Sequence, residues 1–279
     1  MSLTGHLKYD WELTDELKAR FPKPVFNLKG DLLAAQKTKN YAVVGNAFDY
    51  LFRAVVKHHY KHRKIIEETW LADHVINKLI QRYNKRNNPK GEFLSKYYSE
   101  AGEQFATYHS IGEVTSRLIE GAIFLGQLDL YYRCGYVEDY GSFNQADIED
   151  LKAMLSLVDK DVFKVENKCW LNPHFGEASK LVTGADADLI IDETLIDVKT
   201  TKELKLLRRD FNQIFCYYIL SLIGGVNGKK TIKPIKKIGI YFARYGLLWT
   251  IPLSDIAPAK AHHNFKTWFQ QNCLNEAVG

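Results

Sequence analysis

Residues 184–201 read Gly-Ala-Asp-Ala-Asp-Leu-Ile-Ile-Asp-Glu-Thr-Leu-Ile-Asp-Val-Lys-Thr-Thr. Two short runs of β-favouring residues, Leu189–Ile191 and Leu195–Val198, flank the pair Asp192-Glu193. Apolar runs on both sides of two polar residues are typical of a β-hairpin. The segment therefore predicts two antiparallel strands joined by a short turn.

The register of this hairpin determines which side chains share a face. With a two-residue turn, Asp188 lies opposite Asp197, and Asp186 lies opposite Lys199. Because side chains alternate along a strand, these four project from one face. The other face carries the apolar residues Leu189, Ile191, Ile196 and Val198. Asp-Glu is not a favoured tight turn, so a longer loop is an alternative, which would shift the register and put Asp186 in place of Asp188.

Two carboxylates opposed across a hairpin predict a cation site. At a separation of roughly 5 Å they repel unless a cation lies between them, and carboxylate oxygens suit Mg²⁺ or Mn²⁺. Lys199, on the same face, could orient and help to deprotonate a water molecule that attacks a phosphodiester. A solvated surface hairpin is the competing interpretation, because an acidic residue, any residue and then lysine occurs five times in the chain.

The hairpin resembles the PD-(D/E)xK nuclease superfamily, particularly its RecB-like branch. In the helix expected after it, Gln213 and Tyr217 fit that branch's Gln-x-x-x-Tyr motif, and their spacing puts both on one helix face. Far upstream, Gly45 and Asp49 match a Gly-x-x-x-(His/Glu/Asp) motif. An ordinary surface acid is the alternative for Asp49, and Glu113 and Glu120 compete for its role. Ala187 stands where the superfamily's name has proline.

The resemblance implies the site's chemistry. Asp188, Asp197 and the backbone carbonyl of Val198 would hold Mg²⁺ or Mn²⁺, with Asp49 as a further candidate ligand. Lys199 would position the attacking water, and the catalytic set would include Gln213 and Tyr217 as supports. Some RecB-like nucleases hold an iron–sulfur cluster through clustered cysteines. No such cluster is expected here, because the cysteines are dispersed at Cys134, Cys169, Cys216 and Cys273.

The resemblance also implies an α/β fold with a restriction-endonuclease-like mixed sheet of four or five strands flanked by helices. Residues 1–279 would form one nuclease domain, with a helical insert or subdomain at 61–160 and an αβ core at 165–255 that carries the motifs. Helices are expected over 15–20, 46–59, 65–83, 105–132, 145–158 and 203–223, with 105–132 as one long helix or a pair. Strands are expected over 181–183, 189–191, 195–198, 238–243 and 247–251.

The expected reaction is hydrolysis of nucleic-acid phosphodiester bonds, with DNA as the substrate, RNA as an alternative, and a role in DNA processing or defence suggested by the family's habits. The rival functions are a non-catalytic nucleic-acid-binding or partner-binding protein on the same fold, and a hydrolase of small phosphate esters. The chain has no Walker loop, so a helicase or ATPase that works with it would be a separate chain.

Composition fits an ordinary globular protein, with 46% hydrophobic and 25% charged residues. No apolar run is long enough for a membrane span, and the first twenty residues lack the apolar middle of a secretory signal, so a cytoplasmic location is expected. The net charge is only +5, but basic residues cluster at 57–64, 81–90 and 229–237. Such runs suit a phosphate backbone, although most are solvated helix faces and loops.

Overall fold

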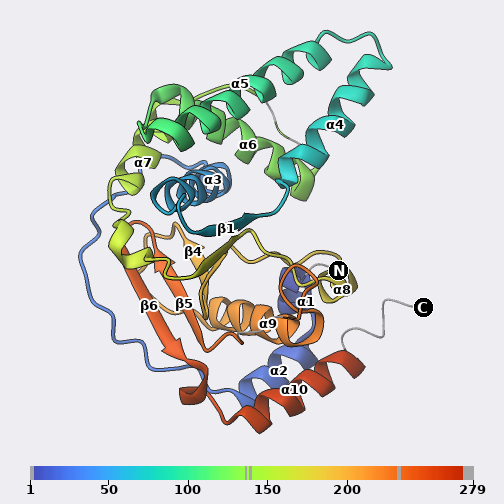
Figure 1. Cartoon of the computed structure of the whole chain (residues 1–279). Helices are drawn as coiled ribbons and strands as arrows, with labels where there is room; N and C mark the ends of the chain where they lie inside the picture. The colour runs from blue at the N-terminus through green and yellow to red at the C-terminus, as the bar shows by residue number, and fades with distance from the viewer. Residues whose placement is uncertain (1–2, 136, 138–139, 231–233, 273–279) are drawn as a thin grey trace.

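A six-stranded mixed sheet separates two layers of helices (Figure 1). The computed structural model describes residues 3–135, 137, 140–230 and 234–272. The strands are β1 (Lys64–Glu67), β2 (Lys168–Leu171), β3 (Leu189–Ile191), β4 (Thr194–Lys199), β5 (Lys237–Phe242) and β6 (Leu247–Pro252). The α-helices are α1 (Leu3–Tyr9), α2 (Trp11–Arg20), α3 (Tyr41–His59), α4 (Leu71–Asn84), α5 (Lys90–Ile111), α6 (Ser116–Cys134), α7 (Gln145–Leu155), α8 (Glu177–Leu181), α9 (Arg208–Gly224) and α10 (Ala259–Asn272).

Strand directions bring several chain segments to one edge of the sheet. The strands are ordered β1 to β6, with parallel pairing in β1–β2 and β4–β5 and antiparallel pairing elsewhere. β1, β2, β4 and β5 therefore end at the same edge, and β3 begins there. Asp188 immediately precedes β3 and Lys199 ends β4, so both lie at this edge, which is called the site edge below.

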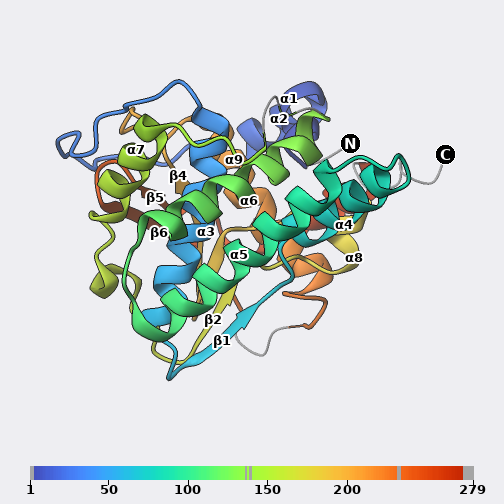
Figure 2. The same cartoon turned by 90° about the horizontal axis from the view of Figure 1, so that it is seen from above.

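Both faces of the sheet are buried. Leu189, Ile191 and Ile196 belong to a core shared with α3, α5 and α6, which confirms the apolar hairpin face expected from the sequence. Ile190 and Leu195, on the other face, belong to a second core with α9, α2 and α10. Figure 2 shows α3, α5 and α6 lying over the sheet when the molecule is viewed from above. No helix in the described part of the chain combines the length and apolar character that crossing a bilayer requires.

The expected mixed α/β architecture is confirmed, but three local predictions were wrong. Lys64–Glu67 is strand β1, where a helix was expected from residue 65, and β2 was not expected. Residues 181–183 end α8 and form a turn instead of a strand. β1 pairs in parallel with β2, about a hundred residues later in the chain. Such non-local pairing overrides local preference and raises the strand count from the expected four or five to six.

One buried arginine ties the end of β4 to the helical layer. The Arg244 side chain, in the turn between β5 and β6, is 2% exposed and forms a two-pronged ion pair with Asp150 of α7, at 2.6 and 2.8 Å. The same guanidinium donates to the carbonyl oxygens of Thr200, at 2.7 Å, and Ala34, at 3.2 Å. Because Thr200 directly follows Lys199, this network positions the site edge.

We expect Asp150→Ala to lower the free energy of unfolding by about 3–5 kcal/mol, because it leaves the Arg244 charge buried without its partner. Urea denaturation followed by circular dichroism measures the change. Glu149→Ala is the matched control. Glu149 precedes Asp150 in the chain, and its carboxylate forms an ion pair with Lys37 on the surface, at 3.2 Å. The control should leave the denaturation midpoint almost unchanged. Equal losses in both variants would contradict the assignment.

Candidate functional site

The β3–β4 hairpin has the register expected from its sequence. Leu189 pairs with Ile196 and Ile191 with Thr194, so the turn contains two residues. One residue beyond the Leu189–Ile196 pair, Asp188 lies opposite Asp197. The Asp188 carboxylate accepts a hydrogen bond from the backbone N–H of Val198. The two acids are therefore neighbours at the site edge.

Asp192 holds the turn that sets this register. Its φ is 50°, in the left-handed region that Asp and Asn tolerate better than most residues. Its carboxylate accepts hydrogen bonds from the backbone N–H groups of Glu166, Asn167 and Lys168, at 3.0, 2.9 and 2.9 Å. This carboxylate joins the turn to the chain entering β2, which explains why Asp-Glu serves here despite being an unfavoured tight turn.

A chain of polar contacts leads from Asp197 into α9. The Lys199 ammonium lies 2.8 Å from Asp197 Oδ2 and donates to Gln213 Oε1 at 3.0 Å. Gln213 Nε2 in turn donates to the Tyr217 hydroxyl at 2.9 Å. Because a lysine can only donate, it fixes the orientation of the glutamine amide and leaves its N–H to Tyr217. The structure thus joins four of the residues that the sequence motifs had singled out.

Lys199 is held in its charged form. Burial alone would lower its pKa, but the charge of Asp197, together with those of Asp210 and Asp188, raises it. Its side chain remains 22% exposed, whereas that of Asp197 is 4% exposed. Lys199 therefore reaches the surface as an ammonium that can donate to a ligand but cannot accept a proton.

Asp49 approaches the hairpin acids from the helical layer. One turn before it on α3, Gly45 packs against the chain directly after β4, where a Cβ at this position would contact Thr200 Oγ1 at 3.4 Å. Asp49 Oδ2 forms an ion pair with Arg53 at 2.7 Å, and its Oδ1 is buried without a hydrogen-bond partner. The charges of Asp49 and the hairpin acids act on one another, so Asp49 lies near the hairpin, where the resemblance implied a further acid.

The three acids repel one another. Burial raises the pKa of Asp188 well above its ordinary value, and the charges of Asp197 and Asp49 raise it further. Burial also raises the pKa of Asp49, against the opposing effect of Arg53. Such crowding of carboxylates is unfavourable in folding alone and is typical of functional sites.

These residues fit a hard divalent cation in the chemistry of their donors. Asp188 and Asp197 supply carboxylate oxygens, and the buried Asp49 Oδ1 lacks a partner. The N–H of Val198 points to Asp188, and in an extended strand the carbonyl of the same residue points to the same side. Among the described residues, no three Asp, Glu, His or Cys side chains form a metal cluster by themselves. The candidate ligands are therefore the carboxylates of Asp188 and Asp197 and the backbone carbonyl of Val198. Asp49 lies near them, but it already forms an ion pair with Arg53.

Other residues considered from the sequence lie elsewhere. Asp186 was expected opposite Lys199, but it forms a β-bridge with His174 beyond the end of the β3–β4 ladder. Glu113 is exposed between α5 and α6, and Glu120 lines a cavity with residues of these two helices and Phe143. The structure therefore places Asp49, and neither glutamate, beside the hairpin acids. Cys273 lies outside the described residues.

Two charged residues at the site were missed in the sequence. Arg53 follows Asp49 by four residues, which is the spacing of a helical ion pair, and its side chain is 4% exposed. Asp210 precedes Gln213 by three residues on α9, and its charge acts on both Lys199 and Asp197. Both could have been identified from the sequence, because they lie three or four residues from Asp49 and Gln213 on the same helices.

Comparisons of the chain with protein-family models, with curated proteins and with solved structures gave no match. The interpretation of the site therefore rests on its residues and their geometry.

We expect Asp188→Asn to raise the thermal stability of the protein without divalent cations. An acid whose pKa is raised by folding costs stability as the pH rises from its unfolded pKa through its folded pKa. Asparagine removes that cost, so the gain in Tm should be larger at pH 8 than at pH 4. Differential scanning calorimetry in EDTA measures it, and a Tm below that of the wild type at pH 8 would contradict the expected repulsion.

Asp192→Asn is a matched substitution with the opposite expected sign. Burial alone would raise the pKa of Asp192, but its three backbone hydrogen bonds lower it. A lowered pKa contributes stability above the unfolded pKa that is lost as the pH falls through the folded pKa. The variant should therefore melt below the wild type at pH 7, and the difference should shrink below about pH 4. Asparagine also tolerates positive φ, so backbone strain does not confuse the comparison.

Proposed function

We propose that the chain is a metal-dependent nuclease of the PD-(D/E)xK superfamily, RecB-like branch, that hydrolyses phosphodiester bonds in DNA. The observation that carries the proposal is the hairpin register, which sets Asp188 beside Asp197 and links Lys199 to Gln213 and Tyr217. β4, α9 and β5 follow one another in the chain, and β4 and β5 are parallel neighbours. This unit supports a restriction-endonuclease-like core.

Asp188, Asp197 and the Val198 carbonyl would hold Mg²⁺ or Mn²⁺, with Asp49 as a further ligand. When bound, such an ion polarises a phosphoryl oxygen and lowers the pKa of a coordinated water. The cation would also relieve the repulsion among the acids. Asp49 would then be shared between the ion and Arg53, which keeps its carboxylate in place.

Lys199 would act as a charged donor in this mechanism. Its side chain is partly exposed, and its ammonium is held on two sides by Asp197 and Gln213. It can orient a water molecule and offset the negative charge that develops on the phosphoryl oxygens. Its raised pKa argues against the alternative in which Lys199 itself removes the proton. Tyr217 holds the Gln213 amide, so both α9 residues act by fixing the direction of the lysine.

We expect Lys199→Ala to lower the rate of DNA cleavage by a factor of about 10²–10³ or more, the usual loss when one donor to a developing charge is removed. Gel electrophoresis of linear, nicked, circular and single-stranded DNA in Mg²⁺ or Mn²⁺ measures it. Lys202→Ala is the control, because Lys202 is exposed three residues further along the chain. Circular dichroism should show that both variants fold. Equal activity of wild type and Lys199→Ala would contradict the proposed role.

We expect Asp197→Ala to abolish the binding of Mn²⁺, since it removes one of two strand carboxylates at the site. Isothermal titration calorimetry of the unliganded protein measures this independently of catalysis. A protein that binds DNA but neither binds Mn²⁺ nor cuts would be the non-catalytic binding platform considered from the sequence. Unchanged Mn²⁺ affinity in Asp197→Ala would place the cation elsewhere and contradict the assigned ligand set.

A further inference from the structure

We infer that α4 and the C-terminal end of α6 form a path for the phosphates of a nucleic-acid strand that leads to the site edge. The inference rests on the proposed nuclease function, which it deepens by assigning a substrate-binding surface. The path consists of the exposed basic residues of α4 and the loop after it, followed by Tyr132 and Arg133 at the end of α6. It is called the α4–α6 path below.

The helical hairpin formed by α4 and α5 carries positive charge at its tip. Between Asp73 and Glu92 the chain contains no acidic residue. All the basic residues in this interval are exposed: His74, Lys78, Arg82, Lys85, Arg86 and Lys90. In Figure 1 this hairpin projects from the helical layer beyond the sheet. A protruding tip with charge of one sign is complementary to a polyanion.

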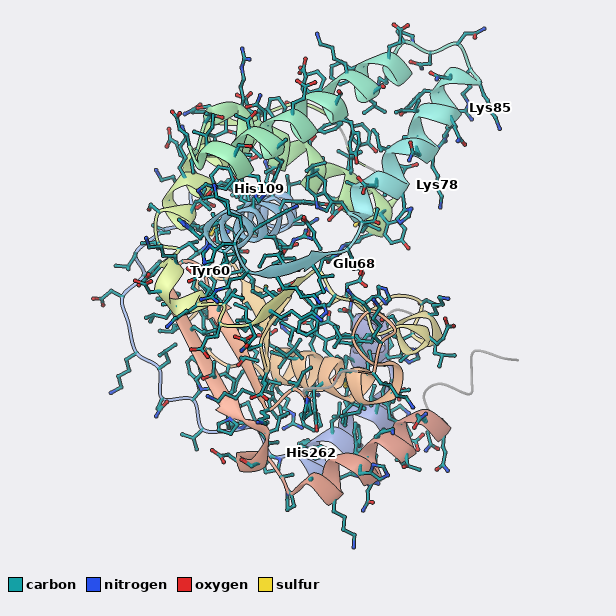
Figure 3. The ribbon with its side chains drawn as sticks, viewed as in Figure 1. Tyr60, Glu68, Lys78, Lys85, His109 and His262 are labelled. Carbon is teal, nitrogen blue, oxygen red and sulfur yellow. The ribbon has the colours of Figure 1, made fainter. Side chains whose placement is uncertain are left out.

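The charges on α4 form a stripe. Its buried residues Ala72, Val75, Ile76 and Leu79 pack into the helical core. Lys78, Arg82 and Lys85 follow at helical spacing on the exposed surface and cover about 10 Å along the helix. Figure 3 shows Lys78 and Lys85 on the side of α4 that faces away from α5. The stripe can therefore contact several successive phosphates of one strand.

The end of α6 connects this stripe to the site. Arg82 Nη1 donates to the Tyr131 hydroxyl at 3.2 Å, so the stripe lies against α6. One turn before Arg133 on α6, the Asp129 carboxylate accepts a hydrogen bond at 2.9 Å from the hydroxyl of Tyr50, the residue next to Asp49. Arg133 itself is exposed. A substrate phosphate leaving the stripe would thus meet Arg133 beside the site acids.

Tyr132 adds an aromatic surface to the path. Its side chain is 58% exposed, although it lies in the last turn of α6. It lines a groove of about 960 Å³ whose other walls come from α8, from the C-terminal end of α9 and from neighbouring loops, and include His174 and Lys180. An exposed aromatic ring next to a cation is the combination on which unpaired bases stack in single-strand-binding proteins.

The basic run at 57–64 ends at the wrong edge of the sheet for this role. Lys64 begins β1, so it lies at the edge opposite Lys199. Figure 3 shows Tyr60 toward the start of β1 and Glu68 just after its end. In the run at 57–64, Lys57 is paired with Glu67 at the site end of β1, and Lys64 lies at the opposite edge. The run at 81–90 lies on the hairpin that follows the site end of that strand, and it contains no acidic residue. Of these two runs, the structure favours the one at 81–90.

The double variant K78Q/K85Q tests the path. Fluorescence anisotropy in EDTA measures the affinity for a labelled DNA duplex, a DNA single strand and an RNA duplex of equal length, over a range of salt concentrations. We expect the slope of log K against log salt to fall by about two for duplex DNA and the affinity to drop about tenfold or more. The matched control is K18Q/K260Q, whose lysines are exposed on α2 and at α10, on the other side of the sheet. It should change neither quantity appreciably.

Tyr132→Ala tests the aromatic part separately. It should weaken binding of the DNA single strand at least about fivefold while leaving the salt slope unchanged, because stacking releases no counterions. Tm values within the range of the controls establish that all variants fold. If the wild type prefers RNA and K78Q/K85Q loses affinity for RNA to the same extent, the α4–α6 path is supported with RNA as its ligand.

The outcomes separate this inference from the nuclease proposal. If wild type binds and cuts DNA while K78Q/K85Q keeps the wild-type affinity and salt slope, the α4–α6 path is wrong and the nuclease proposal stands. If K78Q/K85Q loses affinity but wild type never cuts, the path stands as a binding surface and the proposed reaction is wrong. If wild type binds none of the three probes, the path is overturned.

Discussion

The carboxylate of Asp192 is the contact on which the arrangement of the site depends. It accepts three backbone N–H groups from the chain entering β2 while its own backbone makes the two-residue turn between β3 and β4. In a strand a shift of one residue moves every side chain to the opposite face. Such a slip would turn Asp197 and Lys199 toward the core under α3 and bring apolar residues to α9. A single turn residue thereby keeps the acids and the lysine together.

Around this hairpin the protein accepts an unfavourable concentration of charge. Asp188, Asp197 and Asp49 lie close enough to influence one another's pKa values, and two of the surrounding cations, Lys199 and Arg53, are themselves largely buried. The ion pairs Lys199–Asp197 on β4 and Arg53–Asp49 on α3 offset part of the repulsion between the carboxylates. Rigid support comes from the Arg244 network, which fixes the chain directly after Lys199. A partly exposed, anchored lysine beside repelling carboxylates is poised for a cation and an anionic ligand.

Local patterns predicted well wherever local geometry decides the outcome. The alternation of apolar and polar residues around Asp192 gave the correct hairpin register, and four-residue spacing on a helix correctly paired Gln213 with Tyr217. The same reasoning failed at β1, where Ile65 and Ile66 continue an apparent helical pattern but pair with β2. It also failed for Asp186, which bridges to His174. In both cases the partner is distant in the sequence, or on a different strand from the expected one, so no local pattern encodes it.

The sequence by itself determined the mixed α/β class, the hairpin and the identity of the residues at its site end, because strand alternation and helical periodicity are properties of neighbouring residues. Only the tertiary structure decided that Asp49 joins these acids while Glu113 and Glu120 do not. It alone placed Arg53 and Asp210 within reach of them, and it alone paired Lys57 of the basic run at 57–64 with Glu67. The reason is that these relations depend on how helices pack against the sheet and on the direction of strands far apart in the chain. Such contacts arise from burial of both faces of the sheet, which composition and spacing do not specify.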